Sequence, residues 1–244
     1  MRKLPGIVVI AVLVVMAVAG INSWSGSSPG LGGSRTPRAP VIAPLSPPDA
    51  GARGARRPGV ARGRAAPAHD RDAFGEAWAD VDGNGCNQRD DVLLRDAEPG
   101  TAETARQGAC DHDVLAGSWV DPYTGARLVM TDMKDPAQAQ AVQIDHVVPL
   151  AEAWRSGASA WSDARRERYA NDLGVLVASD GATTQSKGVD DPAAWLPTQE
   201  FQCDYALTWV AVKDAWSLAV DDSEAAALTG MLERCPARRN DPVR

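Results

Sequence analysis

An abrupt change in composition near residue 70 limits what this chain can fold into. Residues 22–70 consist largely of Gly, Ser, Pro, Ala and Arg and show no apolar periodicity. Such a segment buries too little apolar surface to offset the entropy of ordering, so we predict a disordered tether there. Residues 71–239 are then left to form the folded part, followed by a short tail over 240–244. With about 170 residues, this part has the size of a single domain.

The N-terminus has the pattern of an export signal. Arg2 and Lys3 precede an uncharged apolar run from about Gly6 to Ile21, which contains the small residues Ala17–Ala19 near its end. This order is typical of a secretory signal peptide, which we predict over residues 1–21. The run is slightly short of the roughly 20 residues of a membrane span, so an uncleaved N-terminal anchor is the alternative. Either outcome places the domain outside the cytoplasm, as a secreted or extracytoplasmic protein.

Export also decides how the four cysteines are interpreted, because disulfides persist outside the cytoplasm. Four cysteines allow three pairings. Two lie in the N-terminal part of the domain and two near its C-terminus, which favours pairing Cys86 with Cys110 and Cys203 with Cys235. A structural zinc site is the alternative. No two cysteines are spaced as a C-x-x-C knuckle, so disulfides are preferred.

The charge of the domain restricts how it could bind a polyanion. Residues 71–244 carry 16 basic and 30 acidic side chains, a net of −14, whereas the tether carries seven arginines. Nucleic-acid binding relies on Lys and Arg contacts with phosphates, so this domain needs a local basic face or bound cations. The stretch containing Arg165, Arg166 and Arg168 is one place where a phosphate backbone could rest, although a solvated helix face is the simpler interpretation.

The hydrophobic pattern predicts an α+β domain whose strands cluster centrally. After a turn marked by Pro122 and Gly125, two strands are expected at Arg127–Thr131 and at 141–148, paired antiparallel. A short strand is expected at 175–179. Helices are expected around Val92–Leu94, on both sides of a break at Gly157, around Leu207–Ala215, and after an N-cap at Asp222 or Ser223.

The motif IDHVVPL places an acidic residue and a histidine side by side at the end of an apolar strand. Because strand side chains alternate in direction, the Asp145 carboxylate can face a metal ion while the His146 imidazole faces an attacking water. Hydrolysis of a phosphodiester needs a general base and a cation at the developing charge. The activity is expected to fall as the pH drops through about 6.5, where an ordinary histidine becomes protonated. His112 and His69 lack such a context and are expected at the surface and in the tether.

Several longer segments carry a family resemblance. They are DVDGNGCNQRDDVLLRD, SWVDPYTG, IDHVVPLAEAWRSGA, RRERYANDL, TTQSKGVDDPAAWLP and a distal Cys-x-Tyr, and they cover most of residues 76–236. Together they resemble the HNH nuclease domain found at the C-terminus of GmrSD-type restriction enzymes and in many small exported proteins. The resemblance implies a ββα-metal core, within a mainly helical domain, made of a strand ending in the Asp-His pair, a loop, a second strand and a helix with the last metal ligand. Our first hypothesis is therefore an exported endonuclease that uses Mg²⁺ or another divalent cation to cut nucleic acid, DNA rather than RNA, with low sequence specificity.

The resemblance assigns roles to individual residues. His146 matches the general base, and Asp145 matches the first metal ligand. The middle asparagine of the motif, which orients the loop and the base, falls at Asn171 when NDL is aligned. Alignment on the following strand places it at Val175 instead, and Asn171 is the preferred match.

The last metal position departs from the family pattern. Where the family has an asparagine, this chain has Thr184, and a hydroxyl is a poorer oxygen ligand than an amide carbonyl. Thr184 would coordinate weakly or through water, Gln185 would take its place, or the site would be crippled. The last outcome would leave a catalytically weakened HNH-fold protein that binds nucleic acid or a protein partner. Lys187 and Arg89 are the candidates for phosphate contact.

A second metal motif lies earlier in the chain. The segment DVDGNGC at 80–86, with Asp91 in the twelfth place, resembles the first half of a calcium-binding loop. A calcium-stabilised surface protein is therefore a further alternative. The resembling family carries a similar stretch, and Cys86 at the seventh place suggests a turn held by a disulfide. An ordered turn is the preferred interpretation.

Overall fold

The computed structural model describes residues 67–235, all of which belong to one compact unit. The predicted signal segment, the tether up to residue 66 and the tail over 240–244 lie outside the described residues. Within the described part, no helix combines the length and the apolar character needed to cross a membrane.

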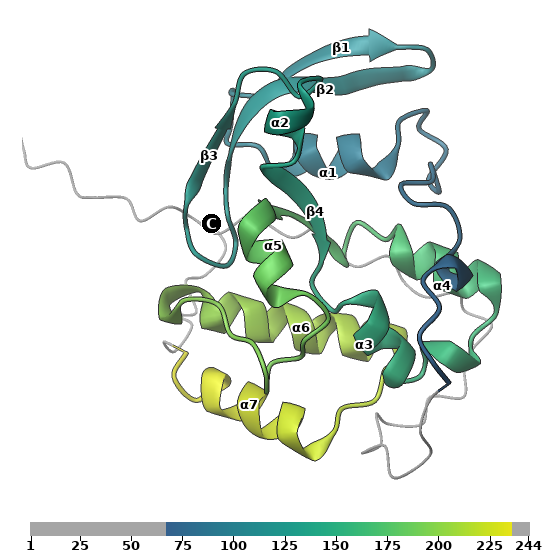
Figure 1. Ribbon diagram of the computed structural model, residues 1–244, viewed down its shortest axis with the longest axis vertical. Coiled ribbons are helices and arrows are strands. Elements are labelled where there is room, and N and C mark those ends of the chain that lie inside the picture. Colours follow the sequence, from purple (N-terminus) through teal and green to yellow (C-terminus); the bar gives the residue numbers. More distant parts are fainter. Residues whose placement is uncertain (1–66, 236–244) are drawn as a thin grey trace, which may run out of the picture. The chain divides into compact units, whose positions relative to one another are not determined.

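Helices and two small antiparallel sheets make up the described chain, as Figure 1 shows. In chain order the elements are η2 (Asp72–Phe74), α1 (Gln88–Asp96), β1 (Glu103–Gln107), β2 (Cys110–Val120), β3 (Arg127–Met130), α2 (Pro136–Ala139), β4 (Val142–His146), α3 (Leu150–Arg155), η3 (Ala158–Ala160), α4 (Asp163–Ala170), β5 (Leu176–Asp180), α5 (Gly181–Lys187), η4 (Gln199–Phe201), α6 (Gln202–Trp216) and α7 (Asp222–Leu232). This mainly helical α+β architecture confirms the predicted fold class.

The first sheet has the order β1–β2–β3 and differs from the prediction. The expected strand near Arg127 pairs with β2 and not with β4, so the predicted pairing is wrong. A tight connection explains the outcome, because Gly125 donates to the Asp121 carbonyl and Asp121 donates to the Ala126 carbonyl. Gly125 has φ +75°, a conformation that favours glycine. β2 and β3 therefore form a local hairpin, and the strands of the domain divide between two sheets.

The second sheet is the hairpin of β4 and β5, in which Asp145 pairs with Val177 and His146 with Leu176. β5 continues directly into α5, whose first turn is capped by the Asp180 side chain. A Cβ atom at Gly181 would lie 2.3 Å from the Gln140 carbonyl oxygen, so only glycine allows α5 to begin so close to the segment before β4. The chain thus has the predicted order of strand, strand and helix.

Two apolar clusters lie on opposite sides of this hairpin. One is formed with α3, α4, α6 and α7 and includes Val177 and Trp209. The other is formed with α1 and β2 and includes Leu176 and Trp119. In Figure 1, the β1–β2–β3 sheet lies at one end and α6 and α7 at the other, with β4 and α5 between them. The hairpin is therefore held from both sides, which fixes the position of the residues at its end.

Both predicted disulfides form, Cys86 with Cys110 and Cys203 with Cys235. The first joins the segment before α1 to the start of β2, and the second joins the start of α6 to the end of the described chain beyond α7. The predicted N-cap of the last helix is misplaced. Asp221 caps α7 and forms a capping box with Glu224, because its carboxylate accepts the Glu224 backbone N–H.

Candidate active site

Asp145, at the penultimate position of β4, is buried and held by two donors. Its Oδ2 atom accepts a hydrogen bond from the Tyr123 hydroxyl at 2.5 Å and lies 2.8 Å from Nζ of Lys187. Burial, followed by the charge of Asp145, raises the pKa of Tyr123 well above 10, so the phenol keeps its proton and donates. Both contacts involve Oδ2, which leaves Oδ1 as the carboxylate oxygen for a ligand in the adjoining pocket.

Lys187 is fully buried and does not face solvent. Besides its ion pair with Asp145, its ammonium donates to the His146 backbone carbonyl at 2.9 Å and lies 5.9 Å from the centroid of the Tyr123 ring. The expected contact between Lys187 and a phosphate does not fit this position, because the ammonium is enclosed and already paired. Its place in the structure is that of a residue that holds the Asp145–His146 segment.

His146 ends β4 and has a defined tautomer. Its Nε2 atom lies 2.9 Å from the Ala170 carbonyl oxygen, and a carbonyl can only accept a hydrogen bond. The neutral ring therefore carries its proton on Nε2, and Nδ1 is the nitrogen with a free lone pair. Burial lowers the pKa of His146 to about 4, although the Ala170 hydrogen bond and Asp145 act in the opposite direction. The imidazole is consequently neutral at physiological pH, the form that a general base requires.

Asn171 follows Ala170 and is buried at the end of α4. Its Nδ2 atom donates to the carbonyls of Glu76 and Glu167, at 3.2 and 3.0 Å. It therefore fixes the position of the segment that accepts the His146 hydrogen bond. The alternative match, Val175, is buried in an apolar cluster and has no polar side-chain atom with which to orient a base.

A pocket of about 460 Å³ lies beside these residues, and its wall includes Asp145, His146, Thr184, Trp78 and Arg89. The Trp78 ring lies nearly parallel to the imidazole, with centroids 6.3 Å apart. The Thr184 Oγ1 atom is buried and has no hydrogen-bond partner. A buried hydroxyl without a partner is costly unless a ligand or water satisfies it.

These groups fit a hard divalent cation. Such ions prefer oxygen ligands and retain several waters, so two protein oxygens are a sufficient anchor. Asp145 Oδ1 and Thr184 Oγ1 are two oxygens that residues of the pocket wall present. Gln185 is the alternative to Thr184 as the last metal ligand. Its side chain is exposed and is not on the pocket wall. Of the two, Thr184 is therefore the residue placed to coordinate.

Comparison with known proteins identifies the family of the chain. Residues 87–231 match the family model described as the C-terminal domain of GmrSD restriction endonucleases. The chain belongs to this family. A relative from Arthroderma benhamiae, named an uncharacterized secreted protein, is 38% identical over 170 residues, which cover 68% of this chain and 76% of the relative. No solved structure matches the chain. The resemblance in sequence is thus confirmed, and it places the chain in a nuclease-related family.

Arg89, the other predicted phosphate contact of this GmrSD-family chain, is placed differently from Lys187. Arg89 lies on the pocket wall, where its guanidinium donates to the carbonyls of Ala139 and Val142. Burial lowers the pKa of Arg89. Its carbonyl contacts involve one terminal nitrogen, so Nε and the other terminal nitrogen remain for a ligand. Arg89 stays a candidate for a phosphate contact.

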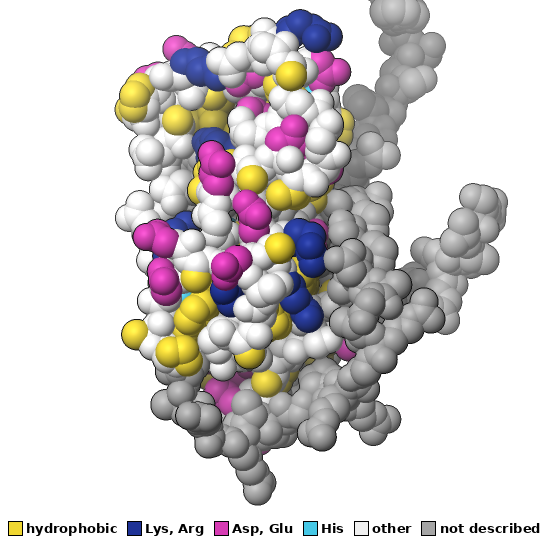
Figure 2. Space-filling view, turned by 90° about the vertical axis from the view of Figure 1, so that its right-hand side faces the viewer, with side chains coloured by type: hydrophobic (Ala, Val, Ile, Leu, Met, Phe, Trp, Pro, Cys, Tyr) yellow, Lys and Arg dark blue, Asp and Glu magenta, His cyan; other side chains and the backbone are white. Residues whose placement is uncertain are grey.

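The basic stretch on α4 is not the free cationic face that the sequence suggested. Arg166 is buried and donates to the carbonyls of Ala73, Ala158 and Trp161. Arg165 lies over the Trp161 ring, 4.5 Å from its centroid. On the face shown in Figure 2, Lys and Arg side chains lie in small separate groups among acidic side chains. Electrostatic attraction of a polyanion to this face is therefore weak. Binding of a phosphate backbone would then depend more on bound cations.

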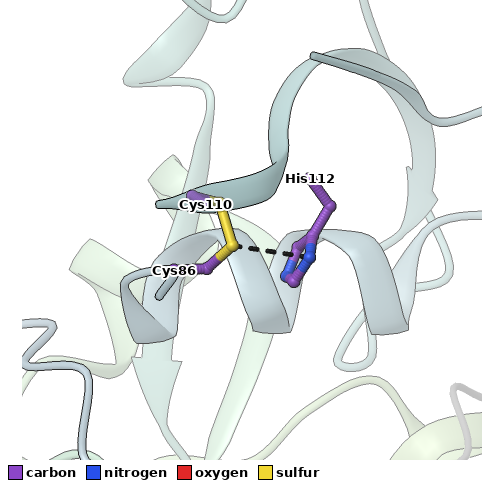
Figure 3. A group of neighbouring side chains, drawn as sticks. All are labelled: Cys86, Cys110 and His112. Atoms are coloured by element: carbon purple, nitrogen blue, oxygen red, sulfur yellow. Dashed lines mark hydrogen bonds between the residues drawn. A yellow bond between two sulfur atoms is a disulfide. The ribbon is translucent and has the colours of Figure 1, made fainter. Parts of the chain in front are cut away.

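The zinc alternative is excluded by the first disulfide. Figure 3 shows Cys86, Cys110 and His112 side by side. Their potential ligand atoms lie within 4.8 Å of one another. The two sulfurs are bonded to each other, however, and zinc binds thiolates. His112 is also engaged, because its ring nitrogens lie 2.7 Å from Asp91 and 2.6 Å from Asp111. This group is a disulfide beside an ion-paired histidine and not a metal site.

Some residues of the site carry no local signal in the sequence. Tyr123 lies in the turn before β3, and only the family segment SWVDPYTG marked its neighbourhood. His69, expected in the tether, lines the pocket, and its ring lies 5.9 Å from that of Trp154. The Pro67 carbonyl also accepts a hydrogen bond from Trp154 Nε1, so contacts with the domain begin before Arg71.

Proposed function

We propose that this protein is an exported, metal-dependent HNH-type endonuclease that hydrolyses phosphodiester bonds, with DNA as its substrate. The observation that carries the proposal is the orientation of His146. Because Nε2 donates to the Ala170 carbonyl, the basic Nδ1 atom is available beside a pocket that also presents Asp145 and Thr184. A neutral base next to oxygen ligands is the combination that phosphodiester hydrolysis needs.

Each residue has a separate part in the proposed reaction. His146 Nδ1 accepts a proton from the attacking water, and Asp145 Oδ1 and Thr184 Oγ1 would hold the cation. A bound Mg²⁺ would supply positive charge to the phosphate oxygens as negative charge develops there. Lys187 and Asn171 act as positioning residues, the first for the Asp145–His146 segment and the second for the carbonyl that orients the imidazole.

Export has independent support. Two disulfides in the described domain are typical of proteins that work outside the cytoplasm. The Arthroderma benhamiae relative is named as secreted. A nuclease in that location would meet nucleic acid released from other cells.

The proposal is tested by incubating the purified full chain with supercoiled plasmid and with single-stranded RNA. Each substrate is combined with Mg²⁺, Mn²⁺, Ca²⁺ or EDTA. Nicking of the plasmid with Mg²⁺ or Mn²⁺, and none with EDTA, is the expected result. Cleavage that EDTA leaves unchanged would contradict metal dependence, and cleavage of RNA alone would contradict the proposed substrate.

Thr184 supports one competing function. If its hydroxyl holds the cation too weakly for turnover, the protein binds nucleic acid without cutting it. Retarded migration of a DNA duplex with no cleavage under any cation would favour this second function over the first.

A further inference from the structure

Part of the wall of the candidate active-site pocket lies outside the region that matches the family. His69, Arg71 and Trp78 line the pocket, whereas the family match begins at residue 87. The segment that carries them is attached to the domain, because the Pro67 carbonyl accepts a hydrogen bond from Trp154 Nε1 at 2.8 Å. Family membership therefore assigns no role to these three residues, although they form part of the pocket.

The balance of charge distinguishes this pocket from the domain as a whole. The charged residues on its wall are Arg71, Arg89 and Asp145. The Asp145 carboxylate is paired with the buried Lys187 at 2.8 Å, so the two guanidinium groups leave the pocket positive. Residues 71–244 together have a net charge of −14. Because a cleft lined by charges of one sign focuses the electric field, a phosphate is attracted to this pocket in spite of the acidic domain.

Arg71 is exposed, and its guanidinium has no partner that would compete with a ligand. Within residues 67–235, no hydrogen bond or ion pair involves this guanidinium. The neighbouring acidic residues are not on the pocket wall, and Asp70 Oδ1 instead accepts the Asp72 backbone N–H at 3.1 Å. All the N–H donors of Arg71 are therefore available, in the planar arrangement that binds a phosphate through two hydrogen bonds.

Trp78 brings an aromatic ring to the same wall through a strained backbone. Its φ of +62° lies in the left-handed region, which a bulky residue rarely adopts. Strained residues of this kind persist where the surrounding structure holds them, and they cluster at active sites and ligand clamps. The side chain is half-buried, and within the described residues its indole N–H donates to no acceptor. The backbone strain at Trp78 thus holds a partly exposed ring beside the His146 imidazole.

We propose that Arg71 and Trp78 bind one nucleic-acid strand at the pocket, Arg71 through a phosphate and Trp78 by stacking on a nucleobase. The inference rests on the proposed function, because it takes this pocket as the place where the strand is cut. A cationic groove with an aromatic ring is a common way to bind single strands, since every base has a π-face. Stacking requires a base that is not paired in a duplex. The preferred substrate is therefore a strand with unpaired bases at the cleavage site.

The test is fluorescence anisotropy of the full chain with two labelled strands, in EDTA so that neither is cut. One is an oligothymidylate of about 12 nucleotides, a usual site size, and the other is an abasic strand with the same phosphates. Trp78→Ala should raise the Kd for oligothymidylate by at least about fivefold, the usual effect of losing one stacked base, and leave the Kd for the abasic strand unchanged. Trp78→Phe, which keeps an aromatic ring, should retain most of the affinity.

The role of Arg71 is tested by the salt dependence of the same binding. Arg71→Gln should weaken binding of both strands. It should also make the slope of log Kd against log salt concentration shallower by about 0.7, the value for one phosphate contact on a single strand. Arg71→Lys keeps the charge and should restore most of the slope. A DNA duplex of the same length should bind more weakly to the wild type than oligothymidylate does.

Arg106→Gln is the matched control for charge, because Arg106 is exposed on β1 and is not on the pocket wall. It should leave the Kd and the slope unchanged. An equal loss of affinity for both strands in Trp78→Ala would indicate a purely structural role and overturn the proposal. An unchanged slope in Arg71→Gln, or a wild type that binds neither strand, would overturn it as well.

Failure of this inference is distinguishable from failure of the proposed function, because binding is measured without cleavage. A wild type that cuts DNA while both variants bind like the wild type would overturn the inference and leave the nuclease function standing. A wild type that cuts nothing, with the expected losses in Trp78→Ala and Arg71→Gln, would support the inference and favour the binding protein over the nuclease.

Discussion

The His146 imidazole donates from Nε2 to the carbonyl oxygen of Ala170 over 2.9 Å. This contact joins the end of β4 to the end of α4, and Asn171 holds the acceptor segment in place through the Glu76 and Glu167 carbonyls. The orientation of the proposed base therefore depends on tertiary structure beyond its own strand. It also determines that Nδ1 is the nitrogen that takes the proton.

The pH dependence of cleavage should reflect the lowered pKa of His146. Because burial lowers this pKa to about 4, the imidazole stays neutral as the pH falls through 6.5. The value of kcat/KM should then decrease only as the pH approaches about 4, where protonation removes the base. A profile measured from pH 4 to 8 at saturating Mg²⁺ checks this. A decrease centred near 6.5, as expected from the sequence alone, would show that His146 is not shifted or is not the base.

Thr184→Asn should strengthen the metal site. An amide oxygen is a better ligand than a hydroxyl, so the Mg²⁺ concentration for half-maximal cleavage should fall severalfold while the pH profile stays unchanged. Gln185→Ala is the matched control, because Gln185 is exposed and outside the pocket. If the alanine variant needs a severalfold higher Mg²⁺ concentration and Thr184→Asn changes nothing, Gln185 is the ligand instead.

Lys187→Met should destabilise the protein. The substitution leaves the buried Asp145 carboxylate without its cation, and breaking a buried pair in this way costs about 3 to 5 kcal/mol. Urea unfolding followed by tryptophan fluorescence measures the loss. Arg127→Met is the control, because Arg127 is an exposed partner of the partly exposed Glu98 and should change the free energy of unfolding by about 0 to 1 kcal/mol. Unchanged stability together with a weaker salt dependence of DNA binding would restore the phosphate-contact role.

Replacing both Cys203 and Cys235 with serine should lower the free energy of unfolding by about 2 to 5 kcal/mol, as loss of a native disulfide does in small exported domains. The effect should appear as a lower urea midpoint than that of the wild type when both are measured under oxidising conditions. Detection of free thiols in the native exported protein by mass spectrometry would contradict the pairing on which this prediction depends.

Sequence analysis predicted the elements whose patterns are local. The apolar run around Ile144, the short strand after Asn171 and the spacing of the cysteines each indicated what the structure contains. The β1–β2 hairpin was missed because the residues of β1 are mostly polar and exposed, so they show no alternating apolar pattern. The partner of β3 was predicted wrongly because the turn at Gly125 determines it, and not the pattern of the strand.

The candidate site was predictable only in part, for a physical reason. His146 and Asp145 stand in one motif, but the contacts that orient them come from Tyr123 and from the Ala170 carbonyl, which are distant in sequence. The burial of Lys187 was also unforeseen. A lysine at the end of a short helix usually faces solvent. Here the Lys187 ammonium forms a buried ion pair with Asp145 on β4.

Cleavage of supercoiled plasmid by the His146→Ala variant tests the central claim most directly. The account predicts that the rate of Mg²⁺-dependent nicking falls by about 10² to 10⁴-fold, the usual contribution of a general base. The circular dichroism spectrum and Tm should remain close to those of the wild type, because His146 lines the pocket and lies outside both apolar clusters. Nicking by a correctly folded His146→Ala protein at the wild-type rate would contradict the account.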